Sequence, residues 1–132
     1  MCEVLDCVGL WGWRGVGHVW VEAVVRNPFT GRGAPVRALV DTGATDAFIP
    51  RRIVRELELP VTGKSVVLTA RGSVELDECI GVLEVMGKRR VVPMLVSDEM
   101  DFALLGVTTL ELLRLEVDPT TGKLKESVAF LL

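Results

Sequence analysis

Apolar and polar residues alternate along much of the chain with the period of a β-strand that has one buried face. The alternation runs through 17–25, and a second apolar stretch at 36–40 follows the turn-forming sequence of 27–33. Two more hairpins are predicted at 65–79 and 81–96, each with a glycine near its turn. The pattern therefore predicts a fold made mainly of paired strands.

Two short segments have the spacing of helices instead. Apolar residues recur at helical intervals between Pro50 and Leu59. Thr108 and Glu111 have the spacing of a capping box, which predicts the start of a second helix. A last hairpin is predicted at 115–126. We therefore expect an all-β domain with one or two short helices.

The hairpin at 65–79 has two apolar strands and a small tip. We expect Val66 and Leu68 to share an apolar face with Val74 and Leu76. The tip, Ala70-Arg71-Gly72-Ser73, carries no large apolar group and has a glycine for the turn. On its own this pattern predicts a surface hairpin.

One apolar stretch ends at a carboxylate. Residues 36–40 lead directly into Asp41, Thr42 and Gly43. An aspartate at the end of a buried strand is costly unless it is hydrogen-bonded or shares a proton. Gly43 allows the backbone to turn sharply and lets another group come close. Asp41 is therefore either a turn-capping residue or a chemically active one.

Composition limits the class of protein. The chain has 132 residues, which is the size of one domain, and 49% of them are apolar. The mean hydropathy of +0.40 argues against disorder. The net charge of −3 gives no basic surface of the kind that binds nucleic acid. We expect a single folded domain, 1–132, without a nucleic-acid partner.

The cysteines and the apolar runs add several expected absences. Cys2, Cys7 and Cys79 are an odd number in a chain with an adequate core, so no disulfide framework is predicted. Cys2 and Cys7 with His18 fit no common zinc spacing, so we expect no metal. No signal peptide and no membrane-spanning run is recognised, so a cytoplasmic protein is predicted. The segment 1–15 has no assigned structure and is treated as an extension.

Two segments together resemble a known family. Ala38–Thr45 and Ala103-Leu104-Leu105-Gly106 resemble the paired signatures of the retropepsin-like aspartic proteases, in particular the small single-domain type of bacteria and archaea. The order of elements from about Gly17 to Glu126 is also similar to that family. The resemblance implies a closed β-barrel acid-protease fold, in which the two segments cross beneath the active site.

The resemblance also implies half an active site per chain. Aspartic proteases use two carboxylates that share one proton and activate a water molecule. With one Asp-Thr-Gly in the chain, Asp41 would have to meet Asp41 of a second copy in a homodimer. The implied activity is that of an endopeptidase that needs no cofactor and binds a polypeptide in extended form.

Roles follow for residues that match the family motifs. Asp41, Thr42 and Gly43 correspond to the catalytic triplet. The hairpin tip would be a flap that closes over the substrate. The implied substrate-binding residues are Leu39, Ala44, Ala70, Arg71, Gly72, Ser73, Phe102 and Leu104. The apolar segment 127–132 resembles the terminal strand through which retropepsin chains pair, so it is predicted to be a dimerisation strand.

Two other hypotheses fit the same residues. The chain could be a catalytically silent retropepsin-like module that dimerises or binds a partner protein, or a β-barrel in which Asp41 only caps a turn. Loss of peptide cleavage in Asp41→Asn would exclude the first. A monomeric protein would favour the second.

Overall fold

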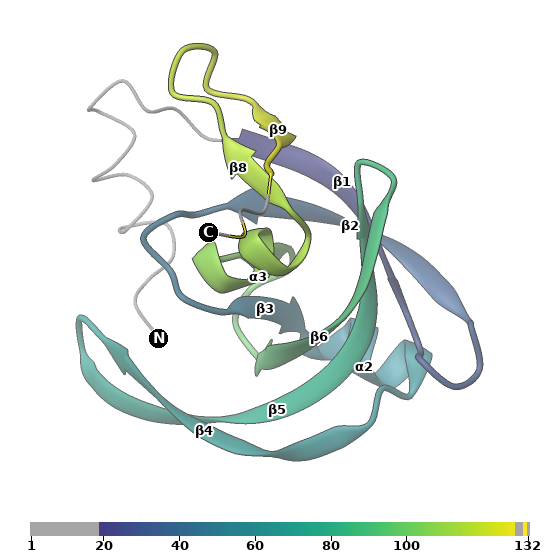
Figure 1. The fold of residues 1–132 in the computed structure, drawn as a ribbon. Coiled ribbons are helices and arrows are strands. Elements are labelled where there is room, and N and C mark those ends of the chain that lie inside the picture. The colour runs from purple at the N-terminus through teal and green to yellow at the C-terminus, as the bar shows by residue number, and fades with distance from the viewer. Residues whose placement is uncertain (1–18, 129–130, 132) are drawn as a thin grey trace.

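The computed structural model describes residues 19–128 and residue 131 (Figure 1). Its elements, in chain order, are β1 (Val19–Arg26), β2 (Gly33–Val40), β3 (Ala47–Pro50), α2 (Arg51–Leu57), β4 (Val61–Thr69), β5 (Gly72–Val85), β6 (Lys88–Ser97), β7 (Ala103–Leu105), α3 (Val107–Leu112), β8 (Leu115–Val117) and β9 (Leu124–Glu126). The predicted mainly-β class with two short helices is confirmed. Neither described helix has the length and apolar content needed to cross a membrane.

Six strands form a closed barrel. The order is β1-β2-β7-β3-β6-β5, and β5 pairs with β1 to complete the ring. The remaining strand of this sheet, β4, pairs with β5 and is not part of the ring. The strands β8 and β9 form a separate two-stranded sheet. The closed barrel expected from the resemblance is therefore present.

The β4–β5 hairpin extends beyond the barrel as a long curved arm (Figure 1). Residues 72–77 of β5 pair with β4 alone, 78 and 79 pair with both β4 and β6, and 80–85 pair with β6. Residues 82–85 pair with β1 on their other side. The chain reverses between Thr69 and Gly72, which lie opposite each other. Gly72 has a φ of 116°, a conformation that favours glycine. The base of this hairpin is thus part of the barrel, and its outer half is a two-stranded ribbon.

The paired strands β2 and β7 separate two apolar clusters. They run parallel, with Leu39 opposite Leu104. Their flanking residues, Ala38 and Val40 on β2 with Ala103 and Leu105 on β7, face the main core. Leu39 and Leu104 face the other way and join a second cluster with Phe48 and Leu95, which we call the floor cluster. The alternation of strand side chains explains this division.

Two local predictions are wrong. Val66 and Leu68 are 67% and 82% exposed, because the register places Val67, and not Val66, opposite Val74. The second helix has Gly106 at its N-cap and no capping hydrogen bond from a side chain, so the predicted capping box is not formed. The amide of Thr108 donates instead to the carbonyl of Thr45.

Candidate active site

Asp41 stands immediately after β2, where the parallel pair with β7 ends. The amide of Asp41 donates to the carbonyl of Leu105 at 3.0 Å, which extends the ladder by one hydrogen bond. The apolar residues 38–40 and 103–105 of the two signature segments are therefore direct neighbours, with Ala38 opposite Ala103. This pairing places the half-buried residue Asp41 at the end of two buried strands.

The residues that follow, 41–46, form the Asp41 loop. The amide of Gly43 donates to Oδ1 of Asp41 at 2.9 Å, and the amide of Ala44 donates to the Asp41 carbonyl at 3.1 Å. Thr42 and Gly43 are exposed, and Ala44 is half-buried. The loop therefore orients the carboxylate through its own backbone, while one carboxylate oxygen has a fixed donor.

The Asp41 loop crosses the start of α3 in close backbone contact. A Cβ added to Gly106 would lie 2.5 Å from the carbonyl oxygen of Asp46 and 2.7 Å from that of Ala44. The amides of Val107 and Thr108 donate to the carbonyls of Ala44 and Thr45 at 2.9 and 3.0 Å. Glycine is required at position 106 because only a residue without a side chain lets the two backbones approach this closely.

The predicted apolar lining residues come together in one place. Leu39 and Leu104 belong to the floor cluster, and Ala44 and Phe102 pack against it. Val67 and Leu76 of the β4–β5 hairpin also pack against this cluster. Leu39 and Leu104 are each only 2% exposed. In a single chain the floor is thus covered, in part by the hairpin itself.

The predicted tip residues lie at the far end of the hairpin. They are all exposed and comprise Ala70, Arg71, Gly72 and Ser73. The turn is closed locally: the Thr69 hydroxyl donates to the carbonyl of Gly72 at 2.9 Å and accepts from the amide of Arg71 at 3.1 Å. The tip is therefore defined by its own turn and does not join the floor cluster.

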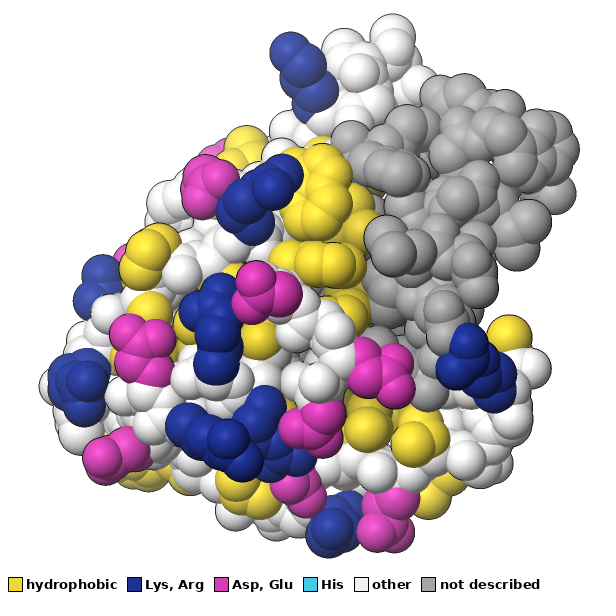
Figure 2. Space-filling model, turned by 180° about the vertical axis from the view of Figure 1, so that it is seen from behind, with side chains coloured by type: hydrophobic (Ala, Val, Ile, Leu, Met, Phe, Trp, Pro, Cys, Tyr) yellow, Lys and Arg dark blue, Asp and Glu magenta, His cyan; other side chains and the backbone are white. Residues whose placement is uncertain are grey.

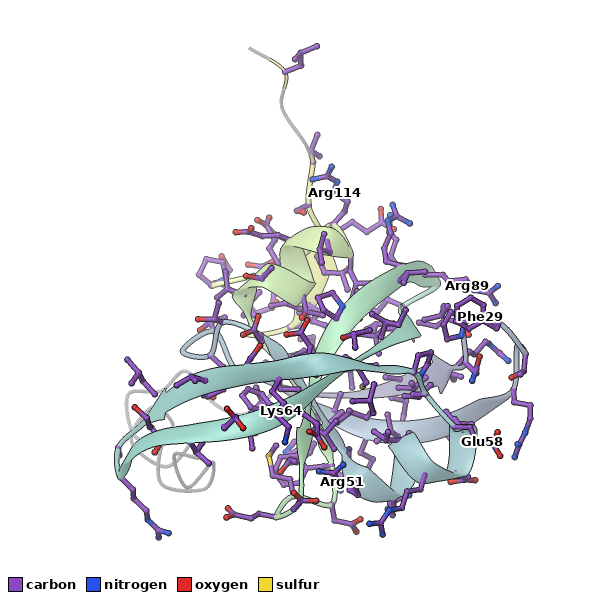
Figure 3. The ribbon with its side chains drawn as sticks, turned by 90° about the horizontal axis from the view of Figure 1, so that it is seen from below. Phe29, Arg51, Glu58, Lys64, Arg89 and Arg114 are labelled. Atoms are coloured by element: carbon purple, nitrogen blue, oxygen red, sulfur yellow. The ribbon has the colours of Figure 1, made fainter. Side chains whose placement is uncertain are left out.

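Charged side chains anchor the base of the same hairpin. On the face shown in Figure 2, basic and acidic side chains lie beside one another over much of the surface. Arg51, the first residue of α2, donates to Asp77 of β5 at 2.9 Å and to Asp98 after β6 at 2.7 Å. Lys64 of β4 lies 3.5 Å from Asp77 and is close to Arg51 in Figure 3. Arg51 thus links the hairpin to two other segments.

The ion pairs shift the pKa values of Arg51, Asp77 and Asp98. The hydrogen bond from Arg51 holds the pKa of Asp77 below its usual range, with Lys64 contributing to the same shift. Arg51 also lowers the pKa of Asp98, and both carboxylates raise the pKa of Arg51. All three groups therefore stay charged at neutral pH.

A small hollow lies between the hairpin base and the Asp41 loop. It has a volume of about 220 Å³ and is lined by Asp46, Ser65, Glu78, Pro93, Met94 and Leu95. The Ser65 hydroxyl donates to the Glu78 carboxylate at 2.6 Å. Asp46 was not among the predicted site residues. Its position in the Asp41 loop, five residues after Asp41, could have indicated that it lies near the site.

The described residues hold no group of three or more potential ligands that could bind a metal. Cys79 is buried, and burial raises the pKa of its thiol to about 12. The suggested ligands Cys2, Cys7 and His18 lie outside the described residues, as does the segment 1–15. For those positions the expected absence of a metal stays a prediction.

Two residues at this site were not identified from the sequence. Trp20 of β1 packs edge-on against Phe102, and Arg51 anchors the hairpin. Both contacts join residues far apart in the chain, so neither produces a local pattern. Only the strand register across the β1–β2 turn would have indicated that Trp20 lies beside Leu39.

The barrel, the crossing at Gly106 and the aspartate at the end of a buried strand define the fold of a retropepsin-like protease. A family model described as "gag-polyprotein putative aspartyl protease" matches residues 29–112, which is more than half of the chain. The chain therefore belongs to this family of aspartyl proteases. The narrower bacterial and archaeal type stays a prediction.

Solved structures support the fold. The EIAV protease complexed with the inhibitor HBY-793 has a TM-score of 0.57 at 19% identity, covering 70% of this chain and 84% of that one. The protease of simian foamy virus (mac) has a TM-score of 0.53 at 23% identity, covering 70% and 91%. The foamy viral protease–reverse transcriptase in complex with an RNA/DNA hybrid has a TM-score of 0.52 at 16% identity, covering 69% and 11%. The comparison with curated proteins gives no match.

Proposed function

We propose that the chain is an aspartic endopeptidase that acts as a homodimer, with Asp41 of each copy in one active site. The observation that carries the proposal is the position of the half-buried residue Asp41 at the end of the β2–β7 pair. Its position is determined by backbone contacts to Leu105 and Gly43. A turn cap would also make the Gly43 contact, but the position of Asp41 at the end of the buried β2–β7 pair, next to Leu39 and Leu104 of the floor cluster, favours catalysis.

The chemistry needs two carboxylates, and a two-fold axis supplies the second. In such a pair the ionised Asp41 removes a proton from water, while the neutral one donates a proton to the carbonyl oxygen of the peptide bond. The water oxygen bonds to the carbonyl carbon. Collapse of the resulting diol then breaks the C–N bond as the amine nitrogen takes up a proton. By the family resemblance, Thr42 joins the two Asp41 loops and Gly43 contacts the substrate backbone.

The substrate is a polypeptide that binds extended between the floor and the β4–β5 hairpin. Leu39, Ala44, Phe102 and Leu104 supply apolar contacts there, and the tip residues Ala70, Arg71, Gly72 and Ser73 close over the chain. The packing of Val67 and Leu76 on the floor cluster supports this arrangement, because the hairpin must lift before Leu39 and Leu104 can be reached. Once the hairpin has lifted, an added strand would satisfy the exposed backbone groups.

Substitution of the aspartate tests the mechanism. Asp41→Asn retains Oδ1 as the acceptor for Gly43 and removes the ionisable group. We expect cleavage of an unfolded protein to fall by at least about a thousandfold, with an unchanged circular dichroism spectrum and melting temperature.

Asp118→Asn is the matched control. Asp118 also accepts a hydrogen bond from the amide two residues later, at 2.8 Å, but it lies in the β8–β9 turn. Cleavage should be unaffected in this variant. A folded Asp41→Asn protein that cleaves at a substantial fraction of the unsubstituted rate would refute the assignment, and an inactive unsubstituted protein would favour the silent module.

The segment 127–132 is proposed to be the dimerisation strand. The amide of Ser127 donates to the carbonyl of Arg114, and beyond it Val128 and Leu131 are 74% and 100% exposed. Apolar side chains this exposed would gain from a partner surface. Deleting 127–132 should give a folded monomer at nanomolar concentration, measured by sedimentation, whose activity partly returns on concentration. A truncated protein that stays dimeric and active would exclude this role.

A further inference from the structure

Trp20 lies on the same face of the sheet as the floor of the candidate site. It pairs with Leu39 across the β1–β2 ladder, and Leu39 precedes Asp41 by two residues. Directly opposed residues in an antiparallel pair point to the same face. Trp20 therefore extends the apolar floor sideways onto β1.

The indole ring is fixed by two neighbours without being covered. Its centroid lies 5.2 Å from that of Phe102 at an interplanar angle of 73°, an edge-to-face contact. The guanidinium carbon of Arg37 lies 4.4 Å from the ring centroid. Trp20 is nevertheless 39% exposed. A large aromatic surface is thus held in one orientation beside Phe102, a residue that packs on the floor cluster.

We propose that Trp20 is a specificity-determining residue, whose ring forms with Phe102 an aromatic wall for one apolar side chain of the bound polypeptide. The inference rests on the proposed function, because it assumes that an extended polypeptide lies over the floor. It adds a residue of β1 to a site otherwise built from β2, the Asp41 loop, Phe102, β7 and the hairpin.

The geometry gives the position of that side chain. Leu39 lies about 7 Å along β2 from Asp41, and Trp20 lies about 5 Å across from Leu39. An extended peptide rises about 3.3 Å per residue. The side chain that meets Trp20 therefore belongs to a residue about two or three positions from the bond at Asp41.

The chemistry of the wall selects the type of side chain. An aromatic or large aliphatic group would bury apolar area against both rings, and an aromatic group would add an edge contact. The Arg37 guanidinium next to the indole would repel a lysine or arginine side chain. The wall should therefore prefer phenylalanine and leucine over alanine, and reject basic residues.

The test measures binding and not cleavage, so that it is independent of catalysis. The protein carries Asp41→Asn, and Trp11→Phe with Trp13→Phe leaves Trp20 as the only tryptophan among the three. The probes are eight-residue peptides with a central Leu-Leu, in which one flanking residue at a time is Phe, Leu, Ala or Lys. One flanking position should show a preference for Phe over Ala of about tenfold in Kd, with a change in Trp20 emission.

Substitutions at Trp20 separate specificity from stability. Trp20→Ala should abolish the Phe preference at that position while leaving Ala-containing peptides within about twofold. Trp20→Phe should retain most of the preference. It serves as the conservative variant, because it keeps an aromatic ring and is expected to fold even if Trp20→Ala does not. Phe29→Ala is the control, because Phe29 is 80% exposed in the β1–β2 turn and should have no effect.

The remaining outcomes are decisive. The inference would be overturned if folded Trp20→Ala kept the preference for Phe, or if the unsubstituted Trp20 site bound none of the peptides. It would also be overturned if Trp20→Ala changed only the oligomeric state of the protein. Peptide binding that depends on Trp20 in a protein that never cleaves would uphold the wall and refute the endopeptidase.

Discussion

The Asp41 loop and the β4–β5 hairpin share the floor cluster but are stabilised in different ways. The loop is fixed by backbone groups, with the amides of Asp41, Val107 and Thr108 all donating to carbonyls across the crossing. The hairpin is held by the ion pairs of Arg51 with Asp77 and Asp98, and among the described residues the strand pairing of its outer half is confined to β4 and β5. The part that would perform the chemistry is therefore rigid, and the part that must admit a polypeptide is held by contacts that can open.

The largest expected effect comes from breaking the crossing. In Gly106→Ala the new Cβ would lie within 2.7 Å of three backbone atoms, none of which can move without shifting the Asp41 loop. We expect a loss of at least about 3 kcal/mol in the free energy of unfolding, measured by urea denaturation, together with loss of activity.

Gly63→Ala provides the matched comparison within the hairpin. A Cβ at Gly63 meets nothing within 4 Å, so the free energy of unfolding should change by less than about 1 kcal/mol. Equal effects at the two glycines would contradict the proposed difference between loop and hairpin.

Loosening the hairpin base should leave the loop intact. Arg51→Ala removes the ion pairs to Asp77 and Asp98 and leaves Asp77 with the longer pair to Lys64 alone. Hydrogen exchange at 61–79 should become several-fold faster, while the amides of Leu39 and Val40 keep their protection. In Arg52→Ala, which loses only an exposed pair to Asp101, exchange should not change. Faster exchange at Leu39 in Arg51→Ala would show that the two regions are coupled.

The same ion pairs predict a dependence on pH. The folded-state pKa values of Asp77 and Asp98 are lowered by Arg51, so the stabilisation is complete above the unfolded carboxyl pKa of about 4. It is lost as the pH falls below that value through the lowered folded-state pKa values. Exchange at 61–79, corrected for the intrinsic rate, should thus be constant from pH 7 to about 5 and rise below about 4. Arg51→Ala should show a smaller rise, because only the contribution of Lys64 to the lowered pKa of Asp77 remains.

The sequence predicted the strands and the position of Asp41 because both depend on local patterns. Alternation through β1 and the apolar run of β2 ending at Asp41 can be read without knowing any long-range contact. The packing of the two signature segments against each other followed from the family resemblance, because no periodicity relates segments this far apart. The register that places Leu39 opposite Leu104 was not predicted.

The errors have equally specific causes. Val66, Val67 and Leu68 are all apolar, so alternation cannot decide which face is covered, and the turn register placed Val67 inward. The capping box failed because the backbone around Thr108 is engaged by the Asp41 loop. Trp20 and Arg51 were missed because their partners are set by the closed barrel. Tertiary contacts thus overrode local signals mainly around the candidate site.

The smallest expected effect concerns the thiol at the base of the hairpin. Cys79 is fully buried, lies opposite Val61 of β4 and Met94 of β6, and has its pKa raised to about 12 mainly by burial. A thiol reagent at pH 8 meets almost no thiolate there, so labelling requires the hairpin base to open. With Cys2→Ser and Cys7→Ser in place, we expect labelling at least about a hundredfold slower than for the unfolded chain.

Arg51→Ala should then speed labelling of Cys79 modestly, by about twofold to fivefold, because Cys79 is also held by β6 and only the β4 side is released. Arg52→Ala should label at the unsubstituted rate. If the hairpin opens from its outer half, Arg51→Ala should speed hydrogen exchange at 72–77 more than it speeds labelling of the Cys79 thiol at the barrel wall. If Cys79 in the unsubstituted protein reacts as fast as in the unfolded chain, the base opens freely and the ion pairs of Arg51 do not anchor it.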